Sequence, residues 1–441
     1  MVQKVRQRKP APAASDSQQL PDPIGGEKAI AVRSGTGIFI STIQYLAGIA
    51  ILTVLVQKGQ EYFFSSEGGI HIQFAQQQHN NNNDTQKATS NNKKHKPHHY
   101  VTVLLPSVVD ENNVGRRLKA IAETWGPAAN SIYIMNDISH FPEGMSTIIT
   151  PEINTSTTPE HPQVLLLPSN MTENNAPRLK YVIERIYEIV NPDFCFFVND
   201  HTFVIPEHLC NYLETVDPTQ DLYAGHALQT KDIIFNSGAA GYILSRTTMR
   251  KLVEKWNEGT DPYCAPNLDD STNKHTKWLQ KSPGLFFASC LKNGLGISPI
   301  DTRDGKYHRF QAFPLTRVVS GDLDQWYLDK HTKEVAKIIA ADESYTHSLN
   351  GPDCCSQSIV SFHYVEHLEC RALFATRQQL TTNPQSSDKD LKDFMISQWP
   401  NTPKDVGGYS RGLPRPQNDQ AWKALLETVR KISKQDLQQE C

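Results

Sequence analysis

The chain has 441 residues, a formal net charge of -3 at pH 7 and a hydrophobic content of 38%. This length allows one large domain with appendages or two domains, because compact domains usually have about 100–200 residues. Lys and Arg are spread along the chain rather than gathered in a basic block, which gives no electrostatic basis for nucleic-acid binding. The many Asn, Gln and Ser residues indicate that part of the chain does not pack into a core.

The amino-terminal region predicts a membrane anchor. Residues 1–36 are polar and basic, as expected of a disordered tail, and residues 37–56 are uncharged and long enough to cross a bilayer as a helix. A cleaved signal peptide fits less well, because the apolar run begins far from Met1 and no small-x-small cleavage site follows it. Basic residues precede the run, so we expect a cytosolic amino end and a luminal body. Residues 57–98 are of low complexity and are interpreted as a stem.

Strand and helix patterns alternate from Tyr100 onward. The predicted strands are 100–105, 131–135, 164–167 and 194–198, and the predicted helices are 113–124 and 178–190. This alternation predicts an α/β fold with a mostly parallel, Rossmann-like sheet and a nucleotide-sized crevice at its strand ends. The chain has no glycine-rich GxGxxG or Walker loop, so a nucleotide would have to be held in another way.

A polar triplet ends the last of these strands. The apolar run 194–198 stops at Asn199, Asp200 and His201, at the sheet edge where α/β proteins bind ligands. A carboxylate beside an imidazole there predicts a metal or phosphate site. A strand end closed by a turn-forming Asn-Asp pair is an equally good interpretation.

A second motif, Ser237-Gly-Ala-Ala-Gly241, follows another predicted strand. Its small residues, Ser237, Gly238 and Gly241 among them, would let a ligand approach the backbone closely, and tight packing explains them equally well.

Near the carboxyl end, residues 419–432 have the pattern of an amphipathic helix, which we expect to pack on the body of the protein.

The chain has eight cysteines and no CxxC pair, which favours disulfides in an oxidising compartment over a zinc ribbon. Connectivity does not follow from their spacing. The sequons at Asn83, Asn154 and Asn170 are compatible with a luminal body.

Four stretches together resemble the core 1 β1,3-galactosyltransferase family of Golgi enzymes. They are 194–209, 236–245, 301–304 and, most specifically, the double cysteine and Ser-Phe-His-Tyr-Val string within 351–365. The resemblance covers about 100–374 and implies a type II membrane protein with a GT-A domain over 99–377, followed by a linker and carboxyl-terminal helix over 378–441.

The resemblance also implies a reaction. Family members use manganese and UDP-galactose and transfer galactose, with inversion, to the 3-hydroxyl of a Ser/Thr-linked N-acetylgalactosamine. Their acidic triplet, which binds metal and donor, falls on Asn199, Asp200 and His201, and a distal metal-binding histidine falls on His363. The implied metal set is therefore Asp200, His201 and His363, and the implied donor site adds the turn 237–241.

The chain departs from the family at two places. Asn199 and His201 replace both outer carboxylates of the triplet, although manganese accepts imidazole as a ligand. The family's catalytic base position falls on Gly284, in a segment that contains no acid, so the catalytic residue is unknown. Another carboxylate could substitute, but two of the candidates more simply order loops. The nearest carboxylates in sequence are Asp269, Asp270, Asp301 and Asp304, of which Asp301 and Asp304 are interpreted as loop-ordering residues.

Further roles follow from the same resemblance. It implies a Cys264–Cys290 disulfide, an acceptor-side position for His308 and a packing role for Thr124-Trp125. Because a bridge between adjacent residues strains the usual geometry, we expect Cys354 or Cys355 to reach a distant cysteine.

Three functions remain open at this level. The first is a Golgi or ER membrane hexosyltransferase that acts on a glycoprotein acceptor. The second is a catalytically inactive relative that binds or chaperones partner glycosyltransferases, and the third is a glycopeptide-binding module. A homodimer is compatible with the first two. Loss of the motif acids favours the second, whereas Asp200, His363 and the small-residue turn favour the first.

Overall fold

The computed structural model describes most of the chain after residue 97. The described residues are 98–106, 111–136, 147–148, 162–171, 176–265, 282–321, 323, 325, 327, 335, 354–399, 415–416 and 418–434, and they fall within one compact unit. Among these residues, no helix has the length and apolarity needed to cross a bilayer. The expected tail at 1–36, the anchor at 37–56 and the stem at 57–98, apart from its last residue, lie outside the described residues.

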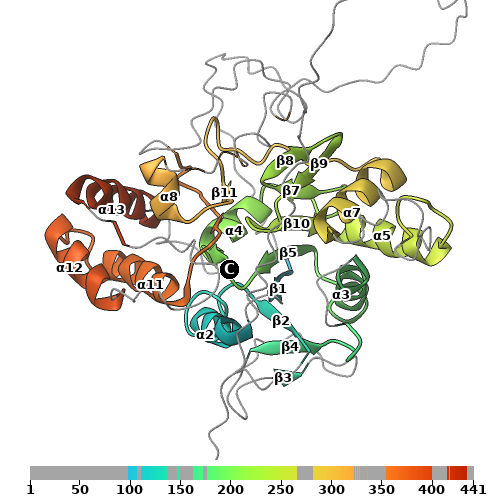
Figure 1. Cartoon of the computed structure of the whole chain (residues 1–441), viewed down its shortest axis with the longest axis horizontal. Helices are drawn as coiled ribbons and strands as arrows, with labels where there is room; N and C mark the ends of the chain where they lie inside the picture. The colour runs from blue at the N-terminus through green and yellow to red at the C-terminus, as the bar shows by residue number, and fades with distance from the viewer. Residues whose placement is uncertain are drawn as a thin grey trace, which may run out of the picture. The chain divides into compact units, whose positions relative to one another are not determined.

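In the described part of the chain, a seven-stranded sheet has the order β3-β4-β2-β1-β5-β10-β7 (Figure 1). Its strands are β1 (Tyr100–Leu105), β2 (Ser131–Met135), β3 (Thr147–Ile148), β4 (Gln163–Leu166), β5 (Phe194–Asn199), β7 (Tyr223–Gly225) and β10 (Tyr242–Ser245). The pairs from β3 to β5 are parallel, whereas β10 runs antiparallel to both β5 and β7. The predicted α/β fold with a mostly parallel sheet is confirmed, and a Rossmann-like arrangement is compatible with it.

Strand β5 is apolar throughout because it is buried on both faces. Phe194, Phe196 and Val198 belong to one hydrophobic core. Cys195 and Phe197 alternate with them and belong to the core on the opposite face of the sheet. This double burial explains why the sequence shows a continuous apolar run instead of an alternating pattern.

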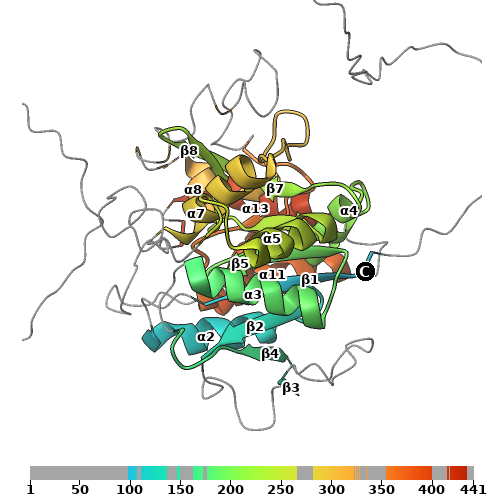
Figure 2. The same cartoon turned by 90° about the vertical axis from the view of Figure 1, so that its right-hand side faces the viewer.

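Helices cover both faces of the sheet (Figures 1 and 2). One face is covered by α2 (Glu111–Ala122), α4 (Pro206–Leu213), α8 (Leu315–Ser320), α11 (His367–Thr382), α12 (Asp388–Gln398) and α13 (Asp419–Ser433). The other face is covered by α3 (Ala176–Ile189), α5 (Arg246–Glu258) and α7 (Pro283–Ser289), which continues into the π-helix η1 (Cys290–Gly294).

The carboxyl-terminal helix α13 packs on the body of the protein, as predicted. Asn418 caps its first turn by accepting a hydrogen bond from the Ala421 amide. Trp422, Leu425 and Val429 then lie on one helical face and belong to the core that α11 also shares. Burial of this face therefore joins the carboxyl-terminal helices to the sheet.

Shorter strands bring distant motifs to the end of β5. Strands β11 (Phe310–Gln311), β12 (Ser361–Phe362) and β6 (Phe203–Val204) form a three-stranded sheet in the order β11-β12-β6. The hairpin of β8 (Ala227–Thr230) and β9 (Ile233–Asn236) leads directly into the turn 237–241. Because β6 follows the polar triplet and pairs with β12, the chain before residue 363 is fixed beside that triplet.

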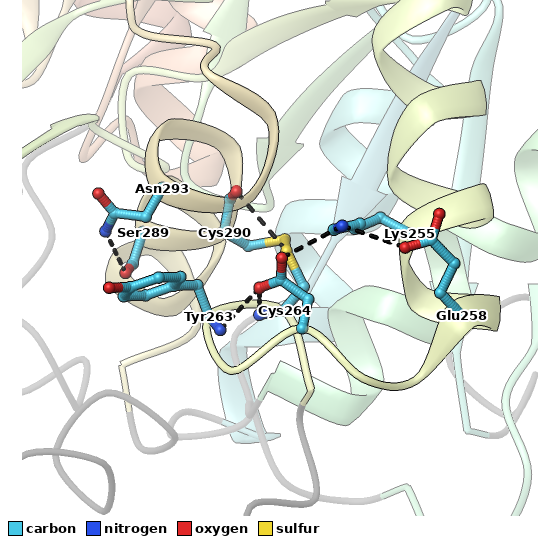
Figure 3. Close-up of a disulfide and its surroundings, with 8 residues drawn as sticks. Lys255, Glu258, Tyr263, Cys264, Ser289, Cys290 and Asn293 are labelled. Atoms are coloured by element: carbon cyan, nitrogen blue, oxygen red, sulfur yellow. Dashed lines mark hydrogen bonds and ion pairs between the residues drawn. A yellow bond between two sulfur atoms is a disulfide. The ribbon is translucent and has the colours of Figure 1, made fainter.

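Two disulfides test the cysteine predictions. Cys264 and Cys290 are bonded, as the resemblance implied, and tie the segment after α5 to the start of η1 (Figure 3). The prediction of a distant partner for Cys354 or Cys355 is wrong, because these residues bond to each other. Both are fully buried, and Cys355 forms a backbone bridge with His308, which fixes the segment in the interior.

Candidate functional site

Three motifs that the sequence singled out converge at the carboxyl end of β5. The Thr202 hydroxyl donates a hydrogen bond to the Ala239 carbonyl over 3.2 Å, which joins the turn after β5 to the turn 237–241. The Val365 amide donates to the His201 carbonyl over 2.9 Å, which joins the same turn to the segment after β12. The candidate site is therefore built from these three segments, together with α2 and the start of α11.

Asn199 organises the turn after β5. Its Oδ1 accepts hydrogen bonds from the His201 amide at 3.0 Å and from the Thr202 hydroxyl at 2.9 Å. Its Nδ2 lies 2.9 Å from His363 Nε2. The His201 amide can only donate, so the atom facing it must be the Asn199 oxygen, and the Asn199 nitrogen faces the imidazole. The turn-forming interpretation of the triplet is confirmed, because Asn199 closes a turn at the strand end, whereas the metal or phosphate site stays a prediction.

Asp200 is part of a buried ion pair. Its Oδ2 lies 2.7 Å from Arg117 Nε, and the two side chains are 0% and 1% exposed. The charge of Asp200 also acts on Arg178, where it opposes the lowering of the guanidinium pKa by burial. The carboxylate that the resemblance assigns to a metal therefore lies against a cation from helix α2.

His201 faces an acidic residue at the start of α11. Its Nδ1 lies 3.5 Å from Glu366 Oε1, and Arg117 Nη1 lies 3.7 Å from Glu366 Oε2. Burial favours the neutral form of Glu366, but hydrogen bonding to His201 and the charges of His201 and Arg117 outweigh it and lower the pKa of Glu366. Arg117, Asp200, His201 and Glu366 thus form one connected polar group, which we call the Arg117 network.

His363 lies on the other side of the triplet. Its ring centroid is 6.1 Å from that of His201, and its side chain is buried. Burial and the nearby His201 lower the pKa of His363 well below its ordinary value, against an opposing contribution from the Ala312 backbone. The next residue, Tyr364, has a φ of 58°, in the left-handed region that non-glycine residues seldom adopt. A strained backbone is therefore built into the Ser-Phe-His-Tyr-Val string.

The residues present do not fit the manganese site that the resemblance implies. Asp200 is paired with a guanidinium, and the Nε2 lone pair of His363 accepts from the Asn199 amide. Among the residues that the structure describes, no group of three or more His, Cys, Asp or Glu side chains is placed to hold a metal ion. A hard divalent ion needs free oxygen or nitrogen lone pairs, so we assign no chemical step to a metal.

The two glycines of the turn 237–241 have different roles. A Cβ added at Gly241, which has a φ of 85°, would lie 2.6 Å from the Phe196 ring. Close packing against β5 therefore requires a glycine at this position. A Cβ added at Gly238 would meet no atom within 4 Å, and Ser237 is held by a 2.7 Å bond from its amide to the His226 carbonyl. Of these two glycines, Gly238 is the one with open space beside its backbone.

The structure places no carboxylate at the family's base position. Gly284 lies in the first turn of α7, in open space. Asp301 accepts hydrogen bonds from Arg303, and Asp304 accepts one from the Ser356 hydroxyl at 2.7 Å, so both order loops as predicted. Asp269 and Asp270 lie outside the described residues.

His308 and Trp125 occupy interior positions. Trp125 is fully buried, which confirms its packing role. His308 is 7% exposed and its ring centroid lies 4.7 Å from that of His226. His226 in turn contacts the Tyr327 hydroxyl over 2.7 Å. The acceptor-side role of His308 stays a prediction.

The sequence analysis did not identify Arg117, Arg178 or Glu366. A signal for the two arginines was present in their helices. Arg117 lies three residues after Val114 and four before Ile121, on the buried face of α2, and Arg178 lies four residues before Val182 on that of α3. A charge on an apolar helical face indicates a buried partner.

Comparison with known proteins gives partial support to the resemblance. No family model matches the chain. The chain is similar to glycoprotein-N-acetylgalactosamine 3-beta-galactosyltransferase 1 of Xenopus laevis, with 27% identity over 187 residues. The match covers 41% of this chain and 43% of that relative, so it spans less than half of either protein. This similarity supports a glycosyltransferase and leaves the reaction and substrates open.

Proposed function

We propose that the chain is a glycosyltransferase that transfers galactose from UDP-galactose to a Ser/Thr-linked N-acetylgalactosamine. The observation that carries this proposal is the partial similarity to a galactosyltransferase named for that acceptor sugar. The convergence of the turn after β5, the turn 237–241 and the end of β12 supports it, because a ligand would lie at this edge of an α/β sheet.

The proposed reaction is an inverting displacement. The acceptor hydroxyl attacks the anomeric carbon of galactose, the bond from that carbon to the UDP oxygen breaks, and the hydroxyl proton passes to a base or to water. The open backbone at Gly238 would let the donor approach the turn 237–241, which Thr202 holds through the Ala239 carbonyl. Position 284 is a glycine, so the family's base position supplies no side chain that could take up this proton.

The same proposal gives the chain a location. We place it in the Golgi or ER membrane as a single-pass type II protein anchored by residues 37–56, with a luminal body that meets glycoprotein acceptors. The Cys264–Cys290 disulfide supports an oxidising compartment, and the sequon residue Asn170 is exposed.

A second function is favoured by one specific observation. Asp200 lies in a buried ion pair with Arg117 and Gly284 offers no base, as expected of an inactive relative that binds glycopeptides or partner glycosyltransferases. Such a protein would need the fold and an acceptor groove but no donor chemistry.

Calorimetric titration of the full-length protein with UDP-galactose tests the first function against the second. We expect saturable binding, weakened strongly by Gly238→Leu, which fills the open space, and little by Gly238→Ala. Absence of binding by UDP-galactose, UDP-glucose and UDP itself would remove the enzymatic function.

A further inference from the structure

The two groups best suited to bind a metal at this site are already occupied by neighbours. The first is His363, whose Nε2 lies 2.9 Å from Asn199 Nδ2. The His201 amide and Thr202 hydroxyl fix the Asn199 oxygen on the opposite side, so the nitrogen cannot turn away from the imidazole without losing both bonds. The Nε2 lone pair of His363 is therefore an acceptor for this chain's own amide.

The second is Asp200, whose carboxylate is bound by Arg117. Both side chains are buried, and the guanidinium also reaches Glu366 at the start of α11. A divalent cation at Asp200 would lie within a few ångströms of this fixed positive charge in a poorly screened interior. Arg117 could move aside only by leaving a buried carboxylate and the interface between α2 and α11.

We propose that Arg117 and Asn199 close the polar end of β5 to divalent metal, and thereby make nucleotide-sugar binding by this chain independent of metal. The first half of this inference concerns the protein alone. The second half rests on the proposed function, because it needs a nucleotide-sugar to bind.

The backbone supports the same closure. Tyr364 holds a left-handed conformation at the point where His363 bonds Asn199 and Val365 bonds the His201 carbonyl. An unfavourable conformation persists only where surrounding contacts fix it. Here the residues on both sides of Tyr364 bond to residues of the triplet. The segment that carries the distal histidine is thus fastened to Asn199 and His201.

Substitutions at Asn199 and at Arg117 test the contribution of each residue to the exclusion of metal. Asn199→Asp keeps both acceptor bonds of the turn, but a carboxylate cannot donate to His363, so the amide no longer occupies Nε2 and a second carboxylate stands beside the imidazole. Arg117→Gln removes the cation beside Asp200. Asn293→Asp adds the same charge near the surface, and Arg371→Gln removes an arginine that joins α11 to Glu123, the residue that follows α2, so these two variants are matched controls.

The experiment titrates the full-length protein with Mn²⁺ alone and follows free Mn²⁺ by electron paramagnetic resonance. Wild type and both controls are expected to bind no Mn²⁺ at a specific site. Asn199→Asp is expected to gain a site, and the double variant Asn199→Asp/Arg117→Gln to bind about 10–100-fold more tightly still, the range by which outer-shell partners alter metal affinity. Asn199→Asp keeps the buried ion pair, so the test stands if Arg117→Gln does not fold.

Tight Mn²⁺ binding by wild type that Asp200→Asn abolishes would overturn the closure, as would failure of the folded Asn199→Asp variant to gain a site. A parallel titration with UDP-galactose, with chelator or with Mn²⁺, tests the second half. Equal affinity in both conditions supports it. Binding that requires Mn²⁺ overturns it and leaves the proposed function standing. If UDP-galactose binds in neither condition, both the metal-independent binding and the proposed function are overturned. The Mn²⁺ titration still tests whether Arg117 and Asn199 exclude divalent metal.

Discussion

Arg117 Nε and Asp200 Oδ2 lie 2.7 Å apart, and this buried pair joins helix α2 to the polar end of β5. Removing one partner of a buried pair leaves an uncompensated charge, which costs far more than losing an exposed pair. We therefore expect Arg117→Gln to lower the free energy of unfolding by about 3–5 kcal/mol.

Urea unfolding of Arg117→Gln beside Arg371→Gln measures this difference. Arg371 on α11 pairs with Glu123, the residue that follows α2, but both side chains are partly exposed, so its loss should cost about 0–1 kcal/mol. Equal costs for the two variants would mean that burial of the Arg117 pair is not what fixes α2 to the triplet.

Gly241 and Gly238 provide a second matched pair. Gly241→Ala combines a φ of 85° with a Cβ 2.6 Å from Phe196, and we expect a loss of about 2–4 kcal/mol from backbone strain and overpacking. Gly238→Ala should change stability little, because its Cβ points into open space. Thermal unfolding of both variants measures this difference in stability. A Gly241→Ala variant as stable as wild type would contradict the prediction.

His226 predicts a loss of stability in acid. The Phe310 carbonyl can only accept, so His226 Nδ1 donates to it over 2.8 Å and Nε2 accepts from the Tyr327 hydroxyl. Burial lowers the pKa of His226 to about 4, below its unfolded value, so the unfolded chain binds the proton first. The stabilisation is present above the unfolded pKa and falls by roughly 1.4 kcal/mol per pH unit as the pH drops below it. His226→Gln should flatten the slope of unfolding free energy between about pH 6.5 and 4, and an unchanged slope would contradict this account.

Glu369 predicts the opposite dependence. Burial, aided by the charge of Glu366, raises the pKa of Glu369 to about 8, so the folded chain retains a proton that the unfolded chain releases. Its contribution is complete below the unfolded pKa and declines as the pH rises toward the folded value. Glu369→Gln cannot ionise, so its stability relative to wild type should rise by roughly 1.4 kcal/mol per pH unit between about pH 5 and 8. Chemical denaturation across this range tests the prediction. A difference in unfolding free energy between variant and wild type that stays constant with pH would show that Glu369 is ionised in the folded chain.

Gly284 offers a gain-of-function test of the proposed reaction. A Cβ added there meets no atom within 4 Å, so Gly284→Asp should fold and place a carboxylate at the family's base position. A placed base typically contributes about 10²–10⁴-fold, and we expect galactose transfer to rise within that range. Gly284→Asn has nearly the same shape without the basic group, so an equal rise in both variants would rule out general-base catalysis as the cause.

The sheet and its helices were largely predictable, whereas the contacts at the site were not. The apolar run 194–198 and the spacing within 178–190 report burial directly, and both elements formed as expected. The pairing of Arg117 with Asp200 spans 83 positions in the chain, and no local pattern reports such a contact. The Cys354–Cys355 bond was not expected because adjacent residues depart from the usual bridge geometry, which was the only ground for the expectation.

The proposed function requires that this chain transfers galactose. The most direct measurement incubates full-length protein with UDP-galactose and a peptide carrying Ser/Thr-linked N-acetylgalactosamine, and follows UDP release and peptide mass together. We predict a mass increase of one hexose, matched by UDP release and reduced by Gly238→Leu. Intact donor and unmodified peptide, under conditions in which the protein is folded and binds the peptide, would contradict the claim and favour the non-enzymatic function.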